Sequence, residues 1–377
     1  LRGVVGIFMF GVQTFFISKA LGFLIRVFMH EMDDKLLGHE FMLYFFFGLN
    51  GLDWLSLIIT LIFQFYLFTK GPELNRKFIK FSAIFVYIGL VCFLITIVSE
   101  NYNELINSIK LSTNIDNIIA KNNISPLIAI VGTMFVYFSI LILTFGDFSR
   151  YAKNTKEMKK GNLSIILNLF IFSFFALLIT LGSDIILTKN AISVERLLTN
   201  PNDIIGKMDN SFLTVISLIF ILISSFSTNL IANYIPAQNT LINFLPNFFT
   251  IKKTGFLICL LALIVATFWL SIFSKVGILT SIDTISAFFG PIFGLIISDY
   301  YLIKKEQINH KELFYPKETT EYIYTRGWNH KGLFSIVIGF IFSASTIWNV
   351  NLTSLQSFAW IIGAFVSFLL YYLISNE

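Results

Sequence analysis

The chain has 377 residues, of which 56 % are hydrophobic and 13 % are charged, whereas a soluble domain carries about 25 % charged residues. This composition excludes a string of soluble domains and predicts a single all-α integral membrane domain over residues 1–377. The formal net charge of +5 does not call for nucleic acid as a partner, because membrane proteins collect Lys and Arg on their cytoplasmic loops.

Apolar runs of about 20 residues predict transmembrane helices that use the lipid bilayer as their solvent. The sequence contains ten such runs, which are Gly3–Leu24, Leu52–Phe68, Phe78–Val98, Pro126–Phe145, Leu163–Leu187, Ser211–Ile235, Gly255–Phe273, Ile278–Ile303, Leu333–Val350 and Gln356–Ile374. A further run, Phe41–Gly51, is apolar but short and broken by glycine. We interpret it as a lead-in to the second span or as an interfacial piece.

The connections between these spans differ in charge. Most of the 27 Lys and Arg residues fall in alternate connections, such as 150–160 and 304–331. Because positive residues accumulate on the cytoplasmic side, this pattern predicts a cell (inner or plasma) membrane protein with both termini of the chain in the cytoplasm. Lys19 and Arg26 then lie near the outer end of the first span, and we expect their side chains to snorkel toward water.

Motifs of intramembrane or soluble enzymes are missing from the sequence. The four His residues lie in loops or at span ends, and neither His-Glu-x-x-His nor Gly-x-Ser-x-Gly occurs. The Asp residues within or beside spans form no pair on one helix. We therefore expect no enzyme and no catalytic residues.

The stretch from Ser224 to Asn233, in the second half of the apolar span Ser211–Ile235, is unusually polar for such a span. Six of its ten residues are Ser, Thr or Asn, and each such group costs several kcal/mol (roughly 2–7) when it is buried without a partner. Ser224, Ser227 and Thr228 stand at helical spacings of three and four, as do Asn229 and Asn233. Two interpretations remain open: helix packing through small hydroxyl residues, or an ion and solute site near the bilayer midplane.

The eighth predicted span carries an ionisable residue and a glycine motif. Asp283 lies about five residues into the span and is a candidate for ion or proton coupling, because charges inside spans are functional candidates by default. The alternative is a carboxylate hydrated near the outer surface. Further along, Gly290 and Gly294 flank Pro291, which permits close helix contact and local irregularity.

Four stretches together resemble the nucleobase–cation symporter family, the permeases for purines, cytosine, uracil, allantoin and hydantoin. Each has a counterpart in the family in the same order along the chain: Phe10–Thr14, Gly146–Lys153, Ser227–Asn229 with Asn233, and Gly290–Gly294 followed by Ser298–Leu302.

The resemblance implies the leucine-transporter fold, with two inverted five-helix repeats and two extra helices. The ten predicted spans then correspond to helices three to twelve of the twelve expected, and the first two helices are expected to be absent from this chain. Residues 1–125 would be the remainder of the first repeat, 126–303 the second repeat and 333–374 the two extra helices. These ranges divide one transporter domain.

The resemblance also implies roles for individual residues. Gln13 and Asn233 match amides that bind the substrate, while Met9 and Phe138 stand where the family has two stacking Trp residues. Ser227 and Thr228 match hydroxyl ligands of sodium, and Ser224 matches a neighbouring backbone carbonyl. Oxygen ligands suit a hard cation such as Na⁺.

The sequence therefore predicts a secondary-active importer that carries a nucleobase or a related cyclic amide by alternating access. The coupling ion is Na⁺ or H⁺, no other cofactor is expected, and the oligomeric state is left open. Two alternatives remain. One is a truncated family member without transport activity, and the other is a transporter of the same fold for amino acids or other solutes.

Overall fold

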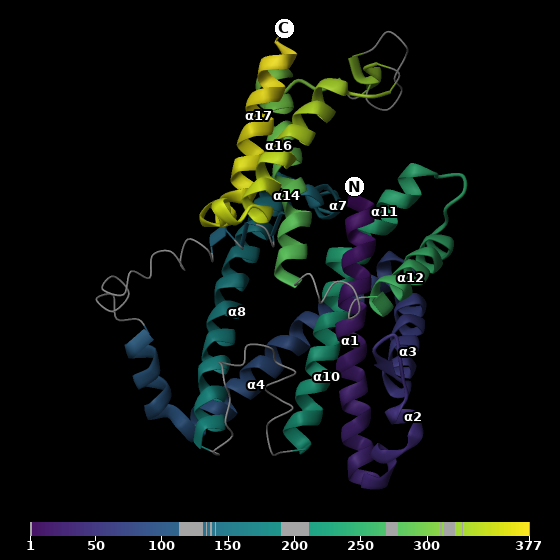
Figure 1. Ribbon diagram of the computed structural model, residues 1–377, viewed down its shortest axis with the longest axis vertical. Coiled ribbons are helices and arrows are strands. Elements are labelled where there is room, and N and C mark those ends of the chain that lie inside the picture. The colour runs from purple at the N-terminus through teal and green to yellow at the C-terminus, as the bar shows by residue number, and fades with distance from the viewer. Residues whose placement is uncertain are drawn as a thin grey trace. The chain divides into compact units, whose positions relative to one another are not determined.

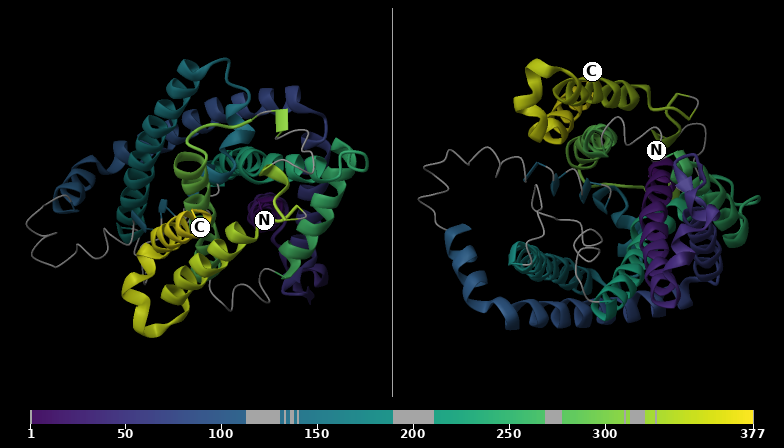
Figure 2. Two further views of the ribbon diagram at one scale, coloured as in Figure 1. Left: turned by 90° about the horizontal axis from the view of Figure 1, so that it is seen from above. Right: turned by 60° about the horizontal axis from the view of Figure 1, so that its bottom comes forward.

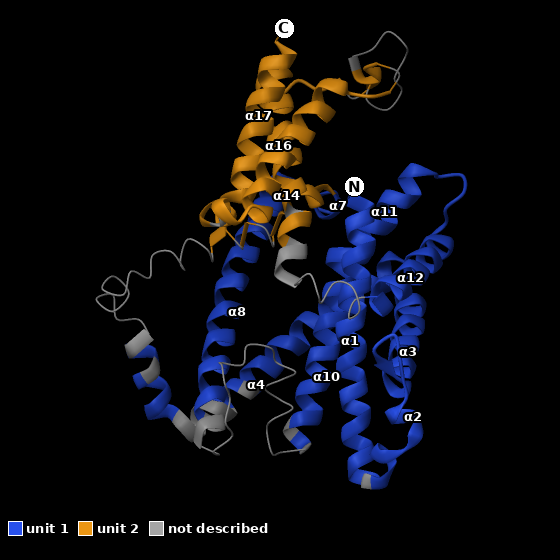
Figure 3. Cartoon of the chain, in the orientation of Figure 1, with its two compact units in different colours: residues 1–117, 147–275 blue, residues 118–146, 276–377 orange. Residues whose placement is uncertain are grey.

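The computed structural model of the chain (Figure 1) describes residues 2–112, 131–132, 134–135, 138–139, 141–189, 211–268, 278–309, 311–312, 321–325 and 327–376. Its residues divide into two compact units, shown in different colours in Figure 3. Unit 1 comprises residues 1–117 and 147–275, and unit 2 comprises residues 118–146 and 276–377. Each unit is described by itself below.

The described secondary structure is almost entirely helical. Up to residue 275 the elements are α1 (Arg2–Met32), the 3₁₀-helix η1 (Asp34–Gly38), α2 (Glu40–Leu43), β1 (Phe45–Phe46), β2 (Leu49–Asn50), α3 (Gly51–Phe68), α4 (Pro72–Ser112), α7 (Phe145–Ser149), α8 (Thr155–Lys189), α10 (Ser211–Thr228), the π-helix η2 (Asn229–Tyr234), α11 (Ile235–Phe244) and α12 (Ile251–Phe268). After residue 275 they are α14 (Ile278–Ile297), the π-helix η4 (Ser298–Ile303), the 3₁₀-helix η5 (Glu321–Ile323), α16 (His330–Trp348), the 3₁₀-helix η6 (Val350–Phe358) and α17 (Ala359–Ser375).

Unit 1 is built around α1. This helix packs against α3, α10, α11 and α12, and it runs beside α10 and α3 in Figure 1 and again in the turned views of Figure 2. The core contains three buried aromatic rings, with the Phe10 ring centroid 5.8 Å from that of Tyr234 and the Phe68 centroid 5.1 Å from that of Tyr234. These rings join α1, α3 and η2 one turn away from the polar residues described below.

The start of α3 is fixed by its capping residues. The Asn50 side chain accepts a hydrogen bond from the Asp53 backbone N–H at 2.9 Å, and the Asp53 carboxylate accepts one from the Asn50 N–H at 3.4 Å. This capping box satisfies two backbone donors that would otherwise lack partners. The preceding run, Phe41–Gly51, forms α2 and the antiparallel β1–β2 hairpin, so it leads into the second span as predicted.

Two of the predicted spans contain a π-helical segment. The predicted span Ser211–Ile235 continues through η2 into α11, and Ile278–Ile303 ends in η4. A π-segment adds a residue to a turn and is frequently found at functional sites. The two segments coincide with Asn229–Asn233 and with Ser298–Leu302, both of which the sequence resemblance singles out.

Unit 2 is held together by the tight packing of α14 against α16 and α17. A Cβ atom at Gly290 or Gly294 would overlap the backbone carbonyl of Trp360 or Ala364 on α17. The sequence prediction that these glycines permit close helix contact is therefore confirmed. Further along the same two helices, polar side chains meet. Asp299 in η4, which continues α14, accepts a hydrogen bond at 2.9 Å from the hydroxyl of Tyr371 on α17.

Eight helical stretches in the described part of the chain are long and apolar enough to cross a membrane. They match eight of the ten predicted spans. Of the other two, Phe78–Val98 lies within α4, and Pro126–Phe145 lies partly outside the described residues. α4 continues to Ser112, so the first part of the loop expected after Val98 is helical.

Candidate functional site

Three side-chain amides from α1 and η2 form a continuous chain of hydrogen bonds. The Asn233 Nδ2 lies 2.8 Å from the Gln13 Oε1 and 2.9 Å from the Asn229 Oδ1. The Gln13 Nε2 donates to the Ser225 backbone carbonyl at 3.3 Å, and the Asn229 Nδ2 donates to the Phe10 carbonyl at 3.3 Å. The structure therefore brings together Gln13 and Asn233, which are about 220 residues apart in the sequence.

The chain continues into α3 through a threonine hydroxyl. The Thr14 Oγ1 lies 3.1 Å from the Asn229 Nδ2, 2.7 Å from the Phe10 carbonyl oxygen and 2.9 Å from the Gln64 Oε1. Thr14, Gln64 and Asn229 are fully buried, and Asn233 is 4 % exposed. Water does not compete for these hydrogen bonds, so each is stronger than it would be at a surface.

The hydrogen-bond partners determine the direction in which the oxygen and the nitrogen of each side-chain amide point. A backbone carbonyl only accepts hydrogen bonds, so Gln13 and Asn229 must turn their nitrogen atoms toward the Ser225 and Phe10 carbonyls. Their oxygen atoms then face Asn233, whose NH₂ group has two hydrogens and uses both. This leaves the Asn233 Oδ1 as an acceptor and the second Gln13 N–H as a donor.

The three predicted sodium ligands lie on one turn of α10. The Thr228 hydroxyl donates to the Ser224 backbone carbonyl at 3.0 Å, so these two oxygen atoms are adjacent. Ser227 is buried, Ser224 is half-buried and Thr228 is exposed. Within the described residues no three His, Cys, Asp or Glu side chains gather as metal ligands. Hydroxyl and carbonyl oxygens of this kind suit a hard cation.

The remaining predicted site residues are distributed over both units. Met9 is half-buried on α1, one turn before Gln13, and so shares its face of the helix. Phe138 and Asp283 belong to unit 2. The Asp283 carboxylate accepts a hydrogen bond at 2.9 Å from the Gln356 Nε2 in η6, and its coupling role stays a prediction.

A charged cluster lies between α1 and α3. Asp53, 4 % exposed, accepts hydrogen bonds from the Lys19 Nζ at 2.7 Å and from an Arg26 guanidinium nitrogen at 2.9 Å. The two cations therefore reach a buried carboxylate, rather than snorkelling to water as expected from the sequence. The sequence signal for this cluster is a negative charge in one predicted span, Asp53, and positive charges in or just after another, Lys19 and Arg26.

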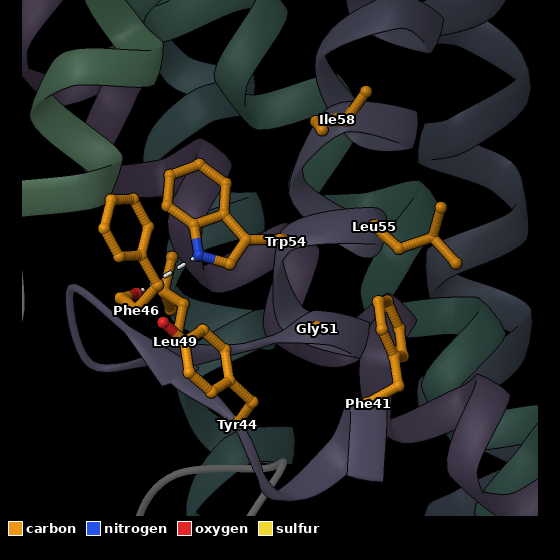
Figure 4. Close-up of a pocket in the computed structure, with 8 residues that line it drawn as sticks. All are labelled: Phe41, Tyr44, Phe46, Leu49, Gly51, Trp54, Leu55 and Ile58. Atoms are coloured by element: carbon orange, nitrogen blue, oxygen red, sulfur yellow. Dashed lines mark hydrogen bonds between the residues drawn. The ribbon is translucent and has the colours of Figure 1, made fainter. Parts of the chain in front are cut away.

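The structure also contains an apolar cavity of about 510 Å³ beside the β1–β2 hairpin (Figure 4). It is lined by Phe41, Tyr44, Phe46, Leu49, Gly51, Trp54, Leu55 and Ile58. The Trp54 indole N–H donates to the Phe46 carbonyl at 3.1 Å and holds the hairpin against α3. None of these residues belongs to the amide chain, and the cavity offers no polar group that would orient a polar solute.

Sequence reasoning missed two members of the amide chain, Thr14 and Gln64, and did not include Asn229 among the site residues. Gln64 was open to prediction, because an amide one turn before the end of the predicted span Leu52–Phe68 requires a buried partner. Thr14 gives no such signal, since a threonine in a helix can bond its own backbone.

Comparison with known proteins places the chain among permeases. A family described as permease for cytosine/purines, uracil, thiamine, allantoin matches residues 1–374. The chain is 29 % identical over 232 residues to an allantoin permease of Bacillus subtilis (strain 168), which covers 61 % of this chain and 45 % of that protein. It is 25 % identical over 341 residues to the purine-uracil permease NCS1 of Arabidopsis thaliana, covering 90 % of this chain and 54 % of the relative. The chain thus spans about half the length of these relatives.

Two solved structures share the fold. A closed conformation of Mhp1, a nucleobase-cation-symport-1 family transporter with bromovinylhydantoin bound, superposes with a TM-score of 0.68 at 18 % identity, covering 100 % of this chain and 74 % of that one. The inward-facing conformation of Mhp1 gives a TM-score of 0.58 at 16 % identity, with the same coverage. The predicted all-α, leucine-transporter-type membrane fold is confirmed by this likeness.

Proposed function

Because the chain belongs to the family of permeases for cytosine/purines, uracil, thiamine and allantoin, we propose that it imports a small cyclic amide together with a cation. The family and the fold relatives are membrane transporters and not enzymes. The proposal places the protein in the cell membrane with both chain termini in the cytoplasm, and the transport step is alternating access around the amide chain of α1 and η2.

The observation that carries the proposal is the fixed orientation of the Gln13 and Asn233 amides. The pair leaves one acceptor, the Asn233 Oδ1, beside one donor, the second N–H of Gln13. A ring amide presents the complementary edge, with an N–H donor next to a carbonyl acceptor. Uracil, allantoin and hydantoin all carry this edge, and cytosine carries it at its N1–H and C2 carbonyl.

Other predicted residues have further roles in this proposal. The Met9 thioether, one turn from Gln13, contacts a ring face, and the role of Phe138, which belongs to unit 2, stays a prediction. Ser224, Ser227 and Thr228 supply oxygen atoms to Na⁺, while Asp283 is the candidate for coupling if H⁺ drives transport instead. One inward charge is worth about 2.3 kcal/mol per 100 mV, which concentrates a neutral solute about fiftyfold.

Uptake of radiolabelled uracil, cytosine and allantoin by the full-length protein in proteoliposomes, with and without a Na⁺ gradient, tests the proposal. We expect gradient-dependent uptake of at least one of these ligands, and competition by the unlabelled ring amide but not by its analogue methylated at the amide nitrogen. The alternatives of a transport-inactive family member or a carrier of amino acids predict no such uptake, which would refute the proposal.

Two substitutions separate the solute role from the ion role. Asn233→Ala removes the acceptor for the ligand N–H and should raise the KM for the ring amide about fivefold or more, since an unpaired buried donor costs roughly 1–3 kcal/mol. Thr228→Ala removes a sodium oxygen and should mainly raise the Na⁺ concentration needed for half-maximal uptake. If both variants lose folded protein equally, the polar stretch serves packing instead.

A further inference from the structure

Gln64 is an amide buried where packing does not require one. It lies one turn before the end of α3, is fully buried, and has Phe63 and Phe65 as its neighbours in the sequence. A Met or Leu side chain would fill the same volume without having to be removed from water as a polar group. Its Oε1 lies 2.9 Å from the Thr14 hydroxyl, which is its contact with the amide chain.

The Thr14 hydroxyl joins three helices at one point. Its oxygen lies within hydrogen-bonding distance of the Phe10 carbonyl on α1, the Gln64 Oε1 on α3 and the Asn229 Nδ2 on η2. In a helix, threonine divides between two side-chain rotamers, because its hydroxyl can bond the preceding turn. The contact with Gln64, together with the contact to the Phe10 carbonyl, favours the rotamer in which the hydroxyl also faces Asn229, and these two acceptors share the single hydroxyl hydrogen.

The direction of Asn229 decides the direction of Asn233. While Thr14 accepts from the Asn229 Nδ2, the Asn229 Oδ1 faces Asn233 and accepts from its NH₂ group. If Asn229 turned over, two NH₂ groups would meet, and Asn233 would have to turn as well. Its nitrogen would then replace its oxygen at the place where the ligand N–H is bound.

We propose that Gln64 is a positioning residue which, through Thr14 and Asn229, holds Asn233 in the orientation that accepts a hydrogen bond from the substrate. The inference rests on the proposed function for its substrate readout. Gln64 does not touch the substrate in this arrangement. It makes the site discriminate between a ring with a free amide N–H and the same ring methylated at that nitrogen.

The test compares Gln64→Met, which keeps the length of the side chain and removes its acceptor, with Thr14→Val, which keeps the shape and removes the hydroxyl. Both should raise the KM for the ring amide about three- to tenfold, the value of one buried hydrogen bond, with kcat changed less than twofold. Both should lower the preference for the free ring over its N-methyl analogue by a similar factor. The double variant should be no worse than either single one, and Thr14→Ser should restore uptake.

Thr60 provides the matched control. It lies one turn before Gln64 on α3, is equally buried, and its hydroxyl has no hydrogen-bond partner, so Thr60→Val should leave KM and ligand preference unchanged. A uniform loss of uptake in Gln64→Met with the ligand preference intact, or effects of Gln64→Met and Thr14→Val that simply add, would overturn the inference.

A second readout does not depend on transport. In a double-mutant cycle of thermal unfolding, Gln64→Met and Thr14→Val should be coupled, whereas Thr60→Val and Thr14→Val should be additive. If the wild-type protein takes up no ring amide, the proposed function fails while coupling in this cycle still supports the hydrogen-bonded relay. Additivity in the cycle overturns the relay whatever the wild-type protein transports.

Discussion

At the scale of single residues, the properties of the candidate site depend on which atoms of each amide form hydrogen bonds within the protein. Asn233 illustrates this, because both hydrogens of its NH₂ group are used by Gln13 and Asn229. Its two partners present oxygen atoms, so the position requires a donor toward the protein and, in the proposed function, an acceptor toward the ligand. An asparagine satisfies both needs, and an aspartate of the same shape satisfies only one.

Asn233→Asp should therefore be more harmful than Asn233→Ala, although it is the more conservative change in shape. The carboxylate would face the Gln13 and Asn229 oxygens, and a mismatched buried polar group costs more than an absent one. We expect a melting temperature below that of Asn233→Ala and a KM at least as high. Aspartate that supports wild-type uptake and stability would show that the amide orientation is not fixed.

The charge cluster of α1 and α3 gives a prediction on stability. Asp53→Asn removes the carboxylate that Lys19 and Arg26 share, and the variant should lose about 1–3 kcal/mol of folding free energy, below the cost of breaking a fully buried pair because both cations are partly exposed. Thermal unfolding in detergent measures the loss. Glu73→Gln, which removes an exposed pair with Lys77, is the control and should change stability by under about 0.5 kcal/mol.

The sequence predicts neighbours along a helix far better than partners across helices. The Asn229 and Asn233 pairing follows from their spacing of four, and the structure contains it as a 2.9 Å hydrogen bond. Gln13 could be selected only through resemblance to a family, because its partners lie on η2 and α10. The Asp53 cluster and the link from Gln64 to Thr14 depend on how α3 packs on α1, which hydrophobic periodicity does not specify.

At the scale of elements, the predicted spans agree with the helices, but their internal irregularity does not follow from the sequence. η2 (NLIANY) contains two Asn residues and η4 (SDYYLI) contains a Ser and an Asp, but polar residues inside a span do not by themselves distinguish a π-turn from an α-turn. A π-turn places Asn229 and Asn233 on the side of η2 that faces α1. The hydrogen bonds to Phe10 and Gln13 give these two buried amides partners on α1.

The contact between α14 and α17 yields an element-scale prediction. Gly294→Ala would push a methyl group into the Ala364 carbonyl and should cost about 1–3 kcal/mol through forced separation of the helices. Gly161→Ala, on α8 where a Cβ meets nothing within 4 Å, should instead raise stability by about 0.5–1 kcal/mol, because alanine favours a helix. Equal melting temperatures for the two variants would contradict the tight packing.

At the scale of the whole molecule, hydropathy and charge together predict the topology. Eight described helical stretches are long and apolar enough to span a membrane, and α17 is a simple case because it is 17 residues long and has no charged residue. Lys331, at the start of α16, donates to the Ile374 carbonyl at the end of α17. This contact places one end of both helices together, and positive residues concentrate at that end, in the connection 304–331.

Fusions at the two ends of α17 test this topology. If positive residues mark the cytoplasmic side, alkaline phosphatase fused after Asn376 should be inactive, because the enzyme folds only outside the cytoplasm, while green fluorescent protein at the same place should fluoresce. Fused after Val350, before α17 begins, the two reporters should give the opposite result. The same outcome at both positions would mean that α17 does not cross the membrane, and exchanged outcomes would mean that the charge pattern does not determine the orientation of this protein.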